Sequence, residues 1–540
     1  MPSLPRKPDR DPRSAPAHGT TRRDVLRFGA AGAVVAPALV ACGSAANPDA
    51  YVRQQDYDDP RRGGRLRIGI AGGSAADSID AHIAVDNTDI ARVFNLYDTL
   101  CAFGTDYAIE MALAESIEPN AEATVWTVVL REGVKFHDGR DITAADVAFS
   151  LRRITDPDDP KTGAAGFATL DRDGIEAVDE RTVKVPFTEA TVNLLDVLAE
   201  YYSGIVPQDY DPAAPVGSGP FKYQDFTAGV RSLFTRFDEY WREGEPFVDE
   251  LEIINFPDDT ARVNALLGGQ VEAISQLPHS QVKVVDAYDH LAVLESESGQ
   301  WLPFTMRVDS EPFDDVRVRQ AFRLIVDRQQ MIDQALSGYG SIGNDLYARF
   351  DPAYADDLPQ REQDIEEAKR LLAEAGHGDG LEVELVTGPI NAGVVEAAQV
   401  FAEQAKAAGV TVNLRRVTSE EFYGDNYLKW DFAQDFWGTR NYVSQAAQGS
   451  LPDAPFNETH WADEEWIDLV KEAQATVDDD ERAELLHSAQ EIEYERGGYI
   501  VWGFTTVIDG YNANVKGFEP SVTGHPLTGY RFRGVWFETK

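Results

Sequence analysis

Two separate regions of the chain alternate strand-like and helix-like residue patterns, and this alternation most restricts the possible folds. In the first region two strands precede a helix, a glycine turn and a further strand, in the segments VRSLFTRF (230–237), VDELEIINF (248–256) and DTARVNALLGGQVEAI (259–274). In the second region a strand, a helix and a strand follow one another in LEVELVTG (381–388), VVEAAQVFAEQAKAAGV (394–410) and TVNLRRV (411–417). Strands that alternate with helices build βαβ units. The sequence therefore predicts an α/β fold with two such regions.

Further elements lie between and before these regions. The apolar spacing predicts one long helix over residues 314–336 and another over residues 364–377. TVWTVVLREGVKF (124–136) indicates two short strands. The following helix is predicted to begin with a capping box, because Thr143 and Asp146 have the required spacing.

Length and charge limit the domain count and the partners. A chain of 540 residues is too long for one hydrophobic core, so two or three domains are expected. Its 49 Lys and Arg against 92 Asp and Glu give a formal net charge of −43. Such a surface repels phosphate backbones, so nucleic acid is excluded as an expected partner.

The N-terminal segment has the order of parts found in an export signal. The twin arginines Arg22 and Arg23 precede a short apolar run over residues 28–41, which ends at Cys42 in the sequence LVAC. This run is too short to span a membrane as a helix. We therefore expect residues 1–41 to be a twin-arginine-type lipoprotein signal, with lipidation at Cys42 and a polar tether over residues 42–63.

The densest group of titratable residues lies in VKFHDGRDITAADVAFS (134–150). His137 and Asp138 are adjacent residues of a predicted turn, so their side chains point apart, whereas catalytic pairs converge from distant segments. The segment is therefore predicted to form a turn that leads into a helix. Familiar nucleophile, phosphate-binding and metal-binding motifs are not evident, and we expect no enzyme activity, no cofactor, no catalytic residue and no metal site.

Several blocks resemble one protein family. They are WTVVLREGVKFHDGRDITAADVAFSLRRI (126–154), VGSGPFKYQDF (216–226), DEYWREGEPFVDELEIINFPDDTARVNALLGGQVEAI (238–274), PFDDVRVRQAFRLIVDRQQMIDQAL (312–336) and EEAKRLLAEAG (366–376). In this order they resemble the family 5 extracellular solute-binding proteins, which serve peptide, nickel and related ABC importers. The resemblance covers nearly all of residues 64–530.

The resemblance implies a two-lobed periplasmic-binding-protein-like clamp of class II type with an additional inserted domain. Lobe I would comprise residues 64–95, 215–305 and 505–540, with additional domain II at 96–214 and lobe III at 306–504. We expect a monomer, exported and anchored only by its lipid to the outer face of the cell membrane. Its partners would be a peptide-like or other polar organic solute and the membrane subunits of an ABC importer. An exported hydrolase and a sensor without transport, both on the same clamp, stay open as alternatives.

The resemblance also points to a ligand site in WDFAQDFWGTRNYVSQ (430–445). Peptide binders of the family have a tryptophan followed three residues later by an aspartate that binds the ligand's ammonium group. Trp437 matches this tryptophan, but Arg440 stands at the aspartate position, where it favours a carboxylate or phosphate. Asn441 and Tyr442 follow as further candidates. Two alternatives are open: Asp435 could receive the amine, or Arg440 could be a solvated or ion-paired loop charge.

Candidate ligand contacts also lie outside this segment. Arg307 stands where relatives usually have asparagine, and it either faces the cleft or pairs with a neighbouring acid. Lobe I offers His82, Asp86 and Asn87, although Asn87 could instead cap a helix. Domain II offers the aromatic residues Phe167, Tyr201 and Tyr202, each of which could line the site or belong to the core.

Overall fold

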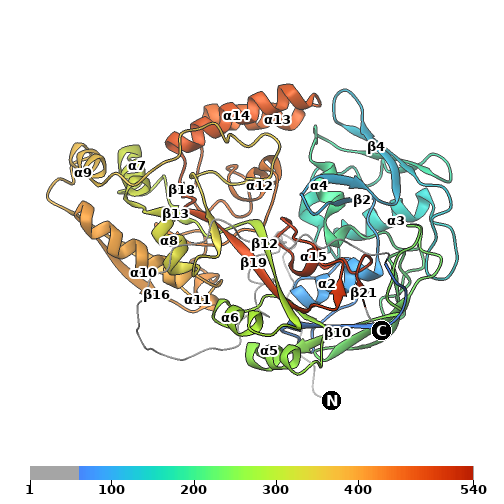
Figure 1. Cartoon of the computed structure of the whole chain (residues 1–540). Coiled ribbons are helices and arrows are strands. Elements are labelled where there is room, and N and C mark those ends of the chain that lie inside the picture. Colours follow the sequence, from blue (N-terminus) through green and yellow to red (C-terminus); the bar gives the residue numbers. More distant parts are fainter. Residues whose placement is uncertain (1–59, 539–540) are drawn as a thin grey trace, which may run out of the picture.

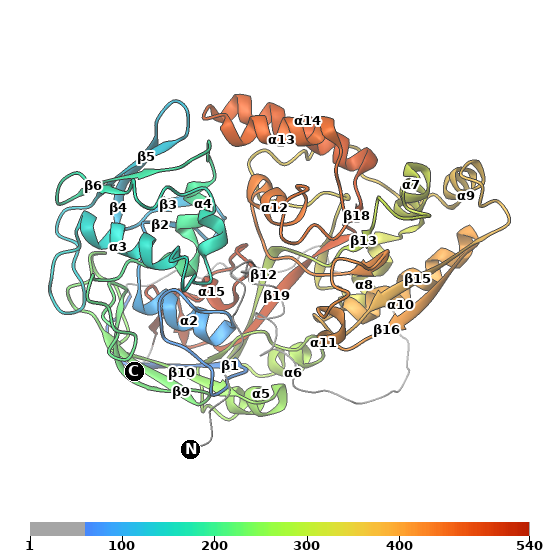
Figure 2. The same cartoon turned by 180° about the vertical axis from the view of Figure 1, so that it is seen from behind.

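The computed structural model describes residues 60–538, which form two bodies joined by a pair of long strands (Figure 1). These strands, β12 (Leu291–Trp301) and β19 (Gly503–Asn512), are antiparallel, belong to the sheet of the first body and lie on its side toward the second body (Figure 2). The predicted signal with Cys42, and nearly all of the tether, lie outside the described residues. Across residues 60–538 no helix combines the length and the hydropathy that a membrane crossing requires.

The first body is built on an eight-stranded sheet in the order β12-β19-β11-β1-β10-β9-β8, with β14 paired to β19. Its other strands are β1 (Arg65–Ala71), β8 (Phe221–Thr227), β9 (Arg231–Arg236), β10 (Glu250–Phe256), β11 (Ala273–Ile274) and β14 (Gly340–Ile342). Smaller elements of this body are α2 (Asn87–Leu96), α5 (Asp259–Leu267), α6 (Val282–Asp286), α15 (Pro526–Gly529), β20 (Val515–Lys516) and β21 (Trp536–Phe537).

The helices of this body cover both faces of the sheet. Ile253 of β10 belongs to the hydrophobic cluster that includes α2, whereas its neighbour Ile254 packs against the cluster that includes α5. Because successive strand residues point to opposite faces, α2 and α5 lie on opposite sides of the sheet. Strand β1 runs parallel to both β10 and β11, so the predicted βαβ unit over residues 248–274 is confirmed.

A smaller domain follows α2 and lies on the same side of the molecule (Figure 1). Its four-stranded sheet has the order β4-β5-β7-β6. Its elements are β2 (Cys101–Phe103), β3 (Ile109–Met111), β4 (Ala114–Pro119), β5 (Val125–Leu130), α3 (Ala144–Ile154), β6 (Glu176–Ala177), β7 (Thr182–Pro186), α4 (Leu194–Ala199) and two single turns at Ala164–Phe167 and Tyr201–Ser203. The predicted capping box at Thr143 and Asp146 is confirmed.

The second body contains a five-stranded sheet in the order β16-β15-β17-β13-β18. The strands are β13 (Phe304–Met306), β15 (Leu381–Thr387), β16 (Val410–Arg416), β17 (Phe432–Gln434) and β18 (Tyr499–Ile500). The helices are α7 (Val316–Ile325), α8 (Arg328–Ala335), α9 (Ile365–Glu374), α10 (Val394–Ala405), α11 (Ser419–Phe422), α12 (Tyr442–Gly449), α13 (Glu464–Ala475) and α14 (Asp479–Arg496). Strands β15 and β16 are parallel, which confirms the second βαβ unit.

The chain changes sheet between Trp301 and Phe304 and again between Ile500 and Gly503. These junctions lie within a few residues of the lobe boundaries expected at 305/306 and 504/505. We propose the same three-part division for the folded chain, and call the parts lobe I, domain II and lobe III.

Two local expectations were wrong. The predicted helix over residues 314–336 is divided into α7 and α8, because the Asp327 carboxylate accepts a hydrogen bond from the Gln330 amide and starts a new helix. The second strand predicted within residues 124–136 is reduced to an isolated bridge between Lys135 and Asp141.

The cluster around His137 holds the segment at Gly217–Gly219, where the chain crosses from domain II to lobe I. His137 Nε2 donates to the Gly219 carbonyl at 3.0 Å, and Nδ1 accepts from the Gly217 amide at 3.2 Å. A Cβ atom at Gly217 would lie 2.0 Å from the Leu96 carbonyl oxygen, so this close approach requires glycine. Burial lowers the pKa of His137 to about 4, so the ring is neutral and both its nitrogens are engaged.

We predict that His137→Ala lowers stability and leaves solute affinity within a few-fold of wild type. The reason is that two hydrogen bonds to the crossing are lost, at a cost of about 1–3 kcal/mol, while no group facing the cleft changes. Thermal unfolding and calorimetry check the two parts separately. His377→Ala, in the turn after α9, is the matched control and should change neither. A hundredfold loss of affinity with an unchanged melting temperature would contradict the structural role.

Candidate functional site

The segment that carries Trp437 and Arg440 leaves lobe III at the joint between the two bodies. Strand β17 ends at Gln434, and three residues later Trp437 pairs with Trp301, the last residue of β12. The two backbone hydrogen bonds of this bridge measure 3.1 and 3.0 Å. The bridge places the residues that follow Trp437 against lobe I.

Thr439 then joins all three parts of the molecule. Its hydroxyl accepts from the Gly299 amide and donates to the Val522 carbonyl, both at 3.0 Å and both in lobe I. Its carbonyl accepts a hydrogen bond from the Tyr107 hydroxyl of domain II, also at 3.0 Å. Thr439 is therefore fixed where lobe I, domain II and lobe III meet.

A partly open hollow lies beside Thr439, and its empty volume of about 340 Å³ includes space open to solvent. Its walls come from all three parts and are formed by Phe94, Phe103, Tyr107, Ala199, Glu200, Thr439, Thr523, His525, Gly529 and Arg531. Two further hollows, of about 480 and 1020 Å³, share Arg531 with this cavity but not Thr439. We refer to the 340 Å³ space as the junction cavity and treat it as the candidate ligand site, because it touches every part that a closing clamp would bring together.

Burial sets the charges in the walls of the junction cavity. Desolvation raises the pKa of Glu200 to about 7, an effect that the positive charge of Arg440 partly offsets. Desolvation lowers the pKa of Arg531 to about 10, so this guanidinium is still charged at neutral pH. Burial, and secondarily the charge of Arg531, lowers the pKa of His525 to about 4 and keeps its ring neutral. The cavity thus offers one carboxyl group and one guanidinium group in a poorly hydrated space.

Arg440 lies in lobe III, three residues after Trp437. Its guanidinium carbon lies 5.6 Å from the Trp437 ring centroid, and its charge lowers the pKa of Glu200 and of Tyr202. Within residues 60–538 its side chain makes no hydrogen bond and no ion pair. Arg440 is therefore a half-buried cation without a hydrogen-bonding or ion-pair partner in the described part of the chain.

The other candidates of the same segment are placed behind the cavity. Trp437 is 1% exposed and stacks on Trp301. Tyr442 is fully buried, and its hydroxyl donates to Glu493 at 2.7 Å. Their rings support the segment from within lobe III, and the structure does not bring them to the cavity wall.

Asn441 instead bridges the two sides of the cleft. Its Nδ2 donates to Asp196 Oδ1 of domain II at 2.9 Å, and the Ser444 hydroxyl donates to Asp196 Oδ2 at 2.8 Å. Asn193 donates to the same serine at 3.3 Å. We call Asn193, Asp196, Asn441 and Ser444 the cleft latch. It connects α4 of domain II with the start of α12 of lobe III.

Asp435, the alternative amine site, is turned away from the junction cavity. Its carboxylate accepts hydrogen bonds from Tyr423 at 2.7 Å and from Tyr427 at 3.2 Å, inside lobe III. Arg307 donates to Asp309 at 3.0 and 2.9 Å and also bonds the Lys429 carbonyl. Of the two interpretations of Arg307, the structure thus shows the pairing with a neighbouring acid.

The lobe I candidates serve the fold around α2. His82 is fully buried, with Nε2 bonded to the Gly204 carbonyl at 2.8 Å and Nδ1 accepting from Arg153 at 2.7 Å. Asp86, not Asn87, is the N-cap of α2, so the proposed capping role of Asn87 was wrong. The reason is that the Asp86 carboxylate accepts the Asp89 amide, whereas Asn87 is the first helical residue.

The domain II aromatics divide between core and cavity. Phe167 is 3% exposed and belongs to the core of domain II. Tyr201 packs edge-on against Phe94 and His525, two residues of the junction cavity wall, and Tyr202 packs against Tyr201. Of the three, Tyr201 comes nearest to the expected role.

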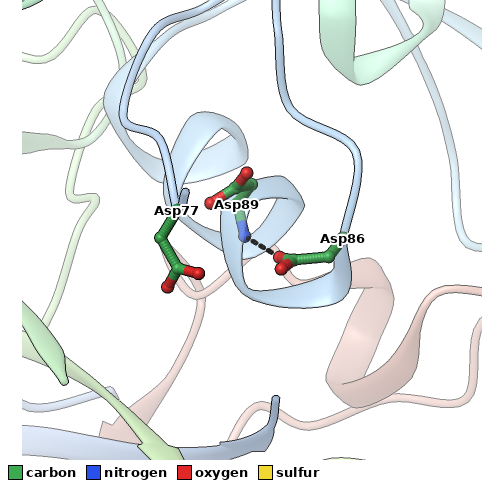
Figure 3. A group of neighbouring side chains, drawn as sticks. All are labelled: Asp77, Asp86 and Asp89. Carbon is green, nitrogen blue, oxygen red and sulfur yellow. Dashed lines mark hydrogen bonds between the residues drawn. The ribbon is translucent and has the colours of Figure 1, made fainter. Parts of the chain in front are cut away.

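One acidic cluster has spacing that a metal ion could use. Oxygens of Asp77, Asp86 and Asp89 lie within 4.8 Å of one another at the start of α2 (Figure 3). Arg92 donates to Asp77 at 2.9 Å and to Asp89 at 2.6 Å, and its side chain is fully buried. The guanidinium offsets part of the negative charge, Asn255 also donates to Asp77, and Asp86 accepts the Asp89 amide. The cluster therefore fits a structural network of ion pairs and hydrogen bonds.

The sequence analysis did not identify Glu200, Arg531 or Asp196. Glu200 directly precedes the aromatic pair at 201–202, and this adjacency was the one available signal. Arg531 lies near the C-terminus, in a segment without helical or strand periodicity. Only the folded chain brings these residues to one place.

Comparison with known proteins agrees with this architecture. The description "Bacterial extracellular solute-binding proteins, family 5 Middle" matches residues 108–452. The glutathione-binding protein GsiB of Pectobacterium atrosepticum is 26% identical over 475 residues, covering 83% of this chain and 90% of GsiB.

Two solved structures show the same fold. AgaA from A. tumefaciens R10, in complex with agropinic acid, superimposes with a TM-score of 0.72 and 26% identity, over 88% of this chain and 99% of AgaA. HbpA2 from Haemophilus parasuis gives a TM-score of 0.77 and 24% identity, over 88% of this chain and 100% of HbpA2. The predicted α/β clamp fold is confirmed. With the family description matched over most of its length, the chain belongs to the bacterial extracellular solute-binding proteins of family 5.

Proposed function

We propose that this solute-binding protein takes up a small polar organic solute, peptide-like or acidic, in the junction cavity and presents the closed, loaded form to the membrane subunits of an ABC importer. The observation that carries the proposal is the junction cavity itself. Three parts of the chain contribute to its wall, and they provide groups of both charge signs. Such a cavity exists only when the parts are together, so a solute that fills it favours the closed arrangement.

The cleft latch supports capture by closure. Asp196 lies on domain II, whereas its partners Asn441 and Ser444 lie on lobe III, so both hydrogen bonds require the two parts to be in contact. Burial raises the pKa of Asp196 to about 6, as expected for a carboxylate that closure of the cleft would remove from water. The latch and the solute would therefore stabilise the same conformation.

The choice of solute class rests on Arg440 and on relatives. A planar guanidinium can hold a carboxylate with two parallel hydrogen bonds. GsiB is named for glutathione, and AgaA was solved with agropinic acid. These names support an acidic or peptide-like solute for this chain. An exported hydrolase is the competing proposal, and mass spectrometry of a bound molecule, unchanged or cleaved, separates the two.

Anchoring and assembly complete the proposal. We propose that Cys42 carries the lipid that holds the protein at the outer face of the cell membrane, and that the protein acts as a monomer. The order twin arginine, apolar run and LVAC supports the anchor. Attachment through one lipid-bearing terminus would leave the folded body outside the membrane, where it can meet the importer.

Cys42→Ser is predicted to release the protein from the membrane fraction into the soluble fraction, because no lipid can be attached to serine. Fractionation and immunoblotting of cells that express each form check this. A variant at the buried Cys101, Cys101→Ser, should remain with the membrane. Unchanged membrane retention of Cys42→Ser would contradict the anchor.

Asp196→Ala is predicted to shift the unliganded protein toward an open form and to weaken solute binding roughly tenfold. Two hydrogen bonds that exist only in the closed arrangement are lost, at about 1 kcal/mol each, and closure then consumes more of the binding free energy. Small-angle scattering and calorimetry with the co-purifying solute measure the two effects. Asp173→Ala, an exposed acid of the same domain, is the control. Identical scattering and affinity for Asp196→Ala would contradict the latch.

Arg440→Ala is predicted to weaken binding of the co-purifying solute about ten- to a hundredfold, since a desolvated charge-assisted contact contributes about 1.5–3 kcal/mol. Arg440→Lys should restore only part of the lost affinity, because an ammonium group cannot donate the two parallel hydrogen bonds of a planar guanidinium. Arg307→Ala is the matched control, since its guanidinium is already paired with Asp309. Calorimetry with the co-purifying solute measures the affinity of wild type and of each variant. Equal affinity for wild type and Arg440→Ala would return Arg440 to the role of a loop charge.

A further inference from the structure

We propose that Arg531 is the end wall of the junction cavity and thereby limits the length of the solute that the protein can enclose. This role rests on the proposed function and adds a residue that determines specificity. Two independent observations carry it. Arg531 lies between three hollows, and a left-handed turn of the backbone holds it there.

The side chains that line the three hollows show where they are separated. The junction cavity and the hollow of about 480 Å³ have Phe94 and Arg531 in common. The junction cavity and the hollow of about 1020 Å³ have Phe103 and Arg531 in common. A side chain that lines two hollows lies between them. Arg531 therefore takes part in both partitions, together with a different phenylalanine in each.

The Arg531 side chain contacts both phenylalanines. Its guanidinium carbon lies 4.7 Å from the centroid of the Phe94 ring, and its Nη1 donates to the Phe103 carbonyl. Phe103 in turn stacks on Tyr107, with ring centroids 4.1 Å apart. The Tyr107 hydroxyl donates to the Thr439 carbonyl at 3.0 Å. The end wall is thus connected to the segment where the three parts of the molecule meet.

The two outer hollows do not depend on lobe III. None of the described residues that line them belongs to lobe III, whereas Thr439 of lobe III lines the junction cavity. A movement of lobe III can therefore open or close the junction cavity only on its own side. On the side of lobe I and domain II, Arg531 separates an enclosed solute from both outer hollows.

A strained turn sets the direction of the Arg531 side chain. The four residues before it, 527–530, have φ angles of 49°, 61°, 66° and 58°. This left-handed conformation is unfavourable for every residue except glycine, and only one of the four is glycine. Backbone strain persists where the surroundings hold it in place, and such positions concentrate at functional sites.

Buried polar side chains hold this turn on both sides of the arginine. The Asp509 carboxylate accepts a hydrogen bond from the Leu527 amide at 2.7 Å. The Asn95 side chain donates to the Tyr530 carbonyl at 2.8 Å and accepts from the Phe532 amide at 3.2 Å. Asp509 and Asn95 are both fully buried. The strained backbone is thus fixed by contacts that belong to the core of lobe I.

Ion pairing does not explain the position of Arg531. Within residues 60–538 no carboxylate oxygen lies within 4.0 Å of its guanidinium nitrogens. A buried cation without an ion pair is unfavourable for stability, so a neutral residue would lower that cost. A long side chain that reaches from a fixed turn to two aromatic residues is what an end wall requires.

The test measures binding as a function of solute length. The probes are L-alanine peptides of two to six residues, and calorimetry measures their affinity for the wild type, Arg531→Ala and Arg531→Met. The wild type should bind peptides up to one limiting length and bind the next longer peptide at least tenfold more weakly. Arg531→Ala should move this limit by one residue or more, because the junction cavity then joins an outer hollow. Arg531→Met should keep the wild-type limit, since methionine retains a long side chain without the charge.

Two further variants make the result interpretable. Arg533→Ala is the matched control, because Arg533 lines both outer hollows but not the junction cavity, and the limit should stay at the wild-type length. Phe94→Ala removes the other side chain between the junction cavity and the 480 Å³ hollow and should move the limit in the same direction as Arg531→Ala. Phe94→Ala decides the question if thermal unfolding shows that Arg531→Ala does not fold.

Three results would overturn the end wall while solute capture stands. The first is an equal loss of affinity for all peptide lengths in Arg531→Ala, which would indicate a general structural role. The second is a limit that moves in Arg531→Met as far as in Arg531→Ala, which would assign the effect to the charge. The third is a wild type that binds all five peptides equally well.

A wild type that binds no peptide but carries a co-purified solute is tested by the release of that solute. Rapid dilution followed by native mass spectrometry measures the release rate. Arg531→Ala should release the solute at least tenfold faster than Arg531→Met, because the opened wall adds a second exit. Equal release rates would overturn the end wall. Absence of any co-purified solute, together with no peptide binding, would overturn the proposed function as well.

Discussion

The antiparallel pairing of β12 with β19 is the interaction on which the rest of the structure depends. Its register runs from Leu291 opposite Asn512 to Trp301 opposite Phe504, with one irregularity between Glu297 and Trp301, so the paired strands lead from lobe I to the edge of lobe III. Trp301 at the end of this ladder bonds Trp437, and the bond brings the 437–442 segment to the joint. The same ladder therefore holds the two bodies together and positions the side chains between them.

The sequence predicted most of the fold because its elements carry strong local signals. Both βαβ units follow from the alternation of strand and helix periods, and the capping box at Thr143 follows from spacing. The division of the helix at Asp327 did not follow, because the apolar period continues across the break. Aspartate is acceptable on an exposed helix face and equally good as an N-cap, and only the packing of α7 and α8 decides between the two roles.

The candidate site was predicted less completely, for a different physical reason. Arg440 could be identified by its distance from Trp437 in the sequence, but Glu200 and Asp196 lie more than two hundred residues away. A partner across a cleft leaves no local pattern. The aromatic candidates failed in the opposite way. Trp437 and Tyr442 are residue types that often line binding sites, but both rings are buried behind the wall of the junction cavity. Residue type alone does not say on which side of a wall a ring lies.

A net charge of −43 would seem to disfavour an acidic solute, but distance and screening separate the surface from the cavity. At physiological salt the field of exposed charges decays over about 8 Å. Inside the junction cavity the effective dielectric is lower, so the charged groups of its wall, Glu200 and Arg531, act at short range with little screening. The acidic surface therefore lowers the association rate of an anionic solute. The affinity for the bound solute depends on the few charged groups that closure of the cleft would remove from water.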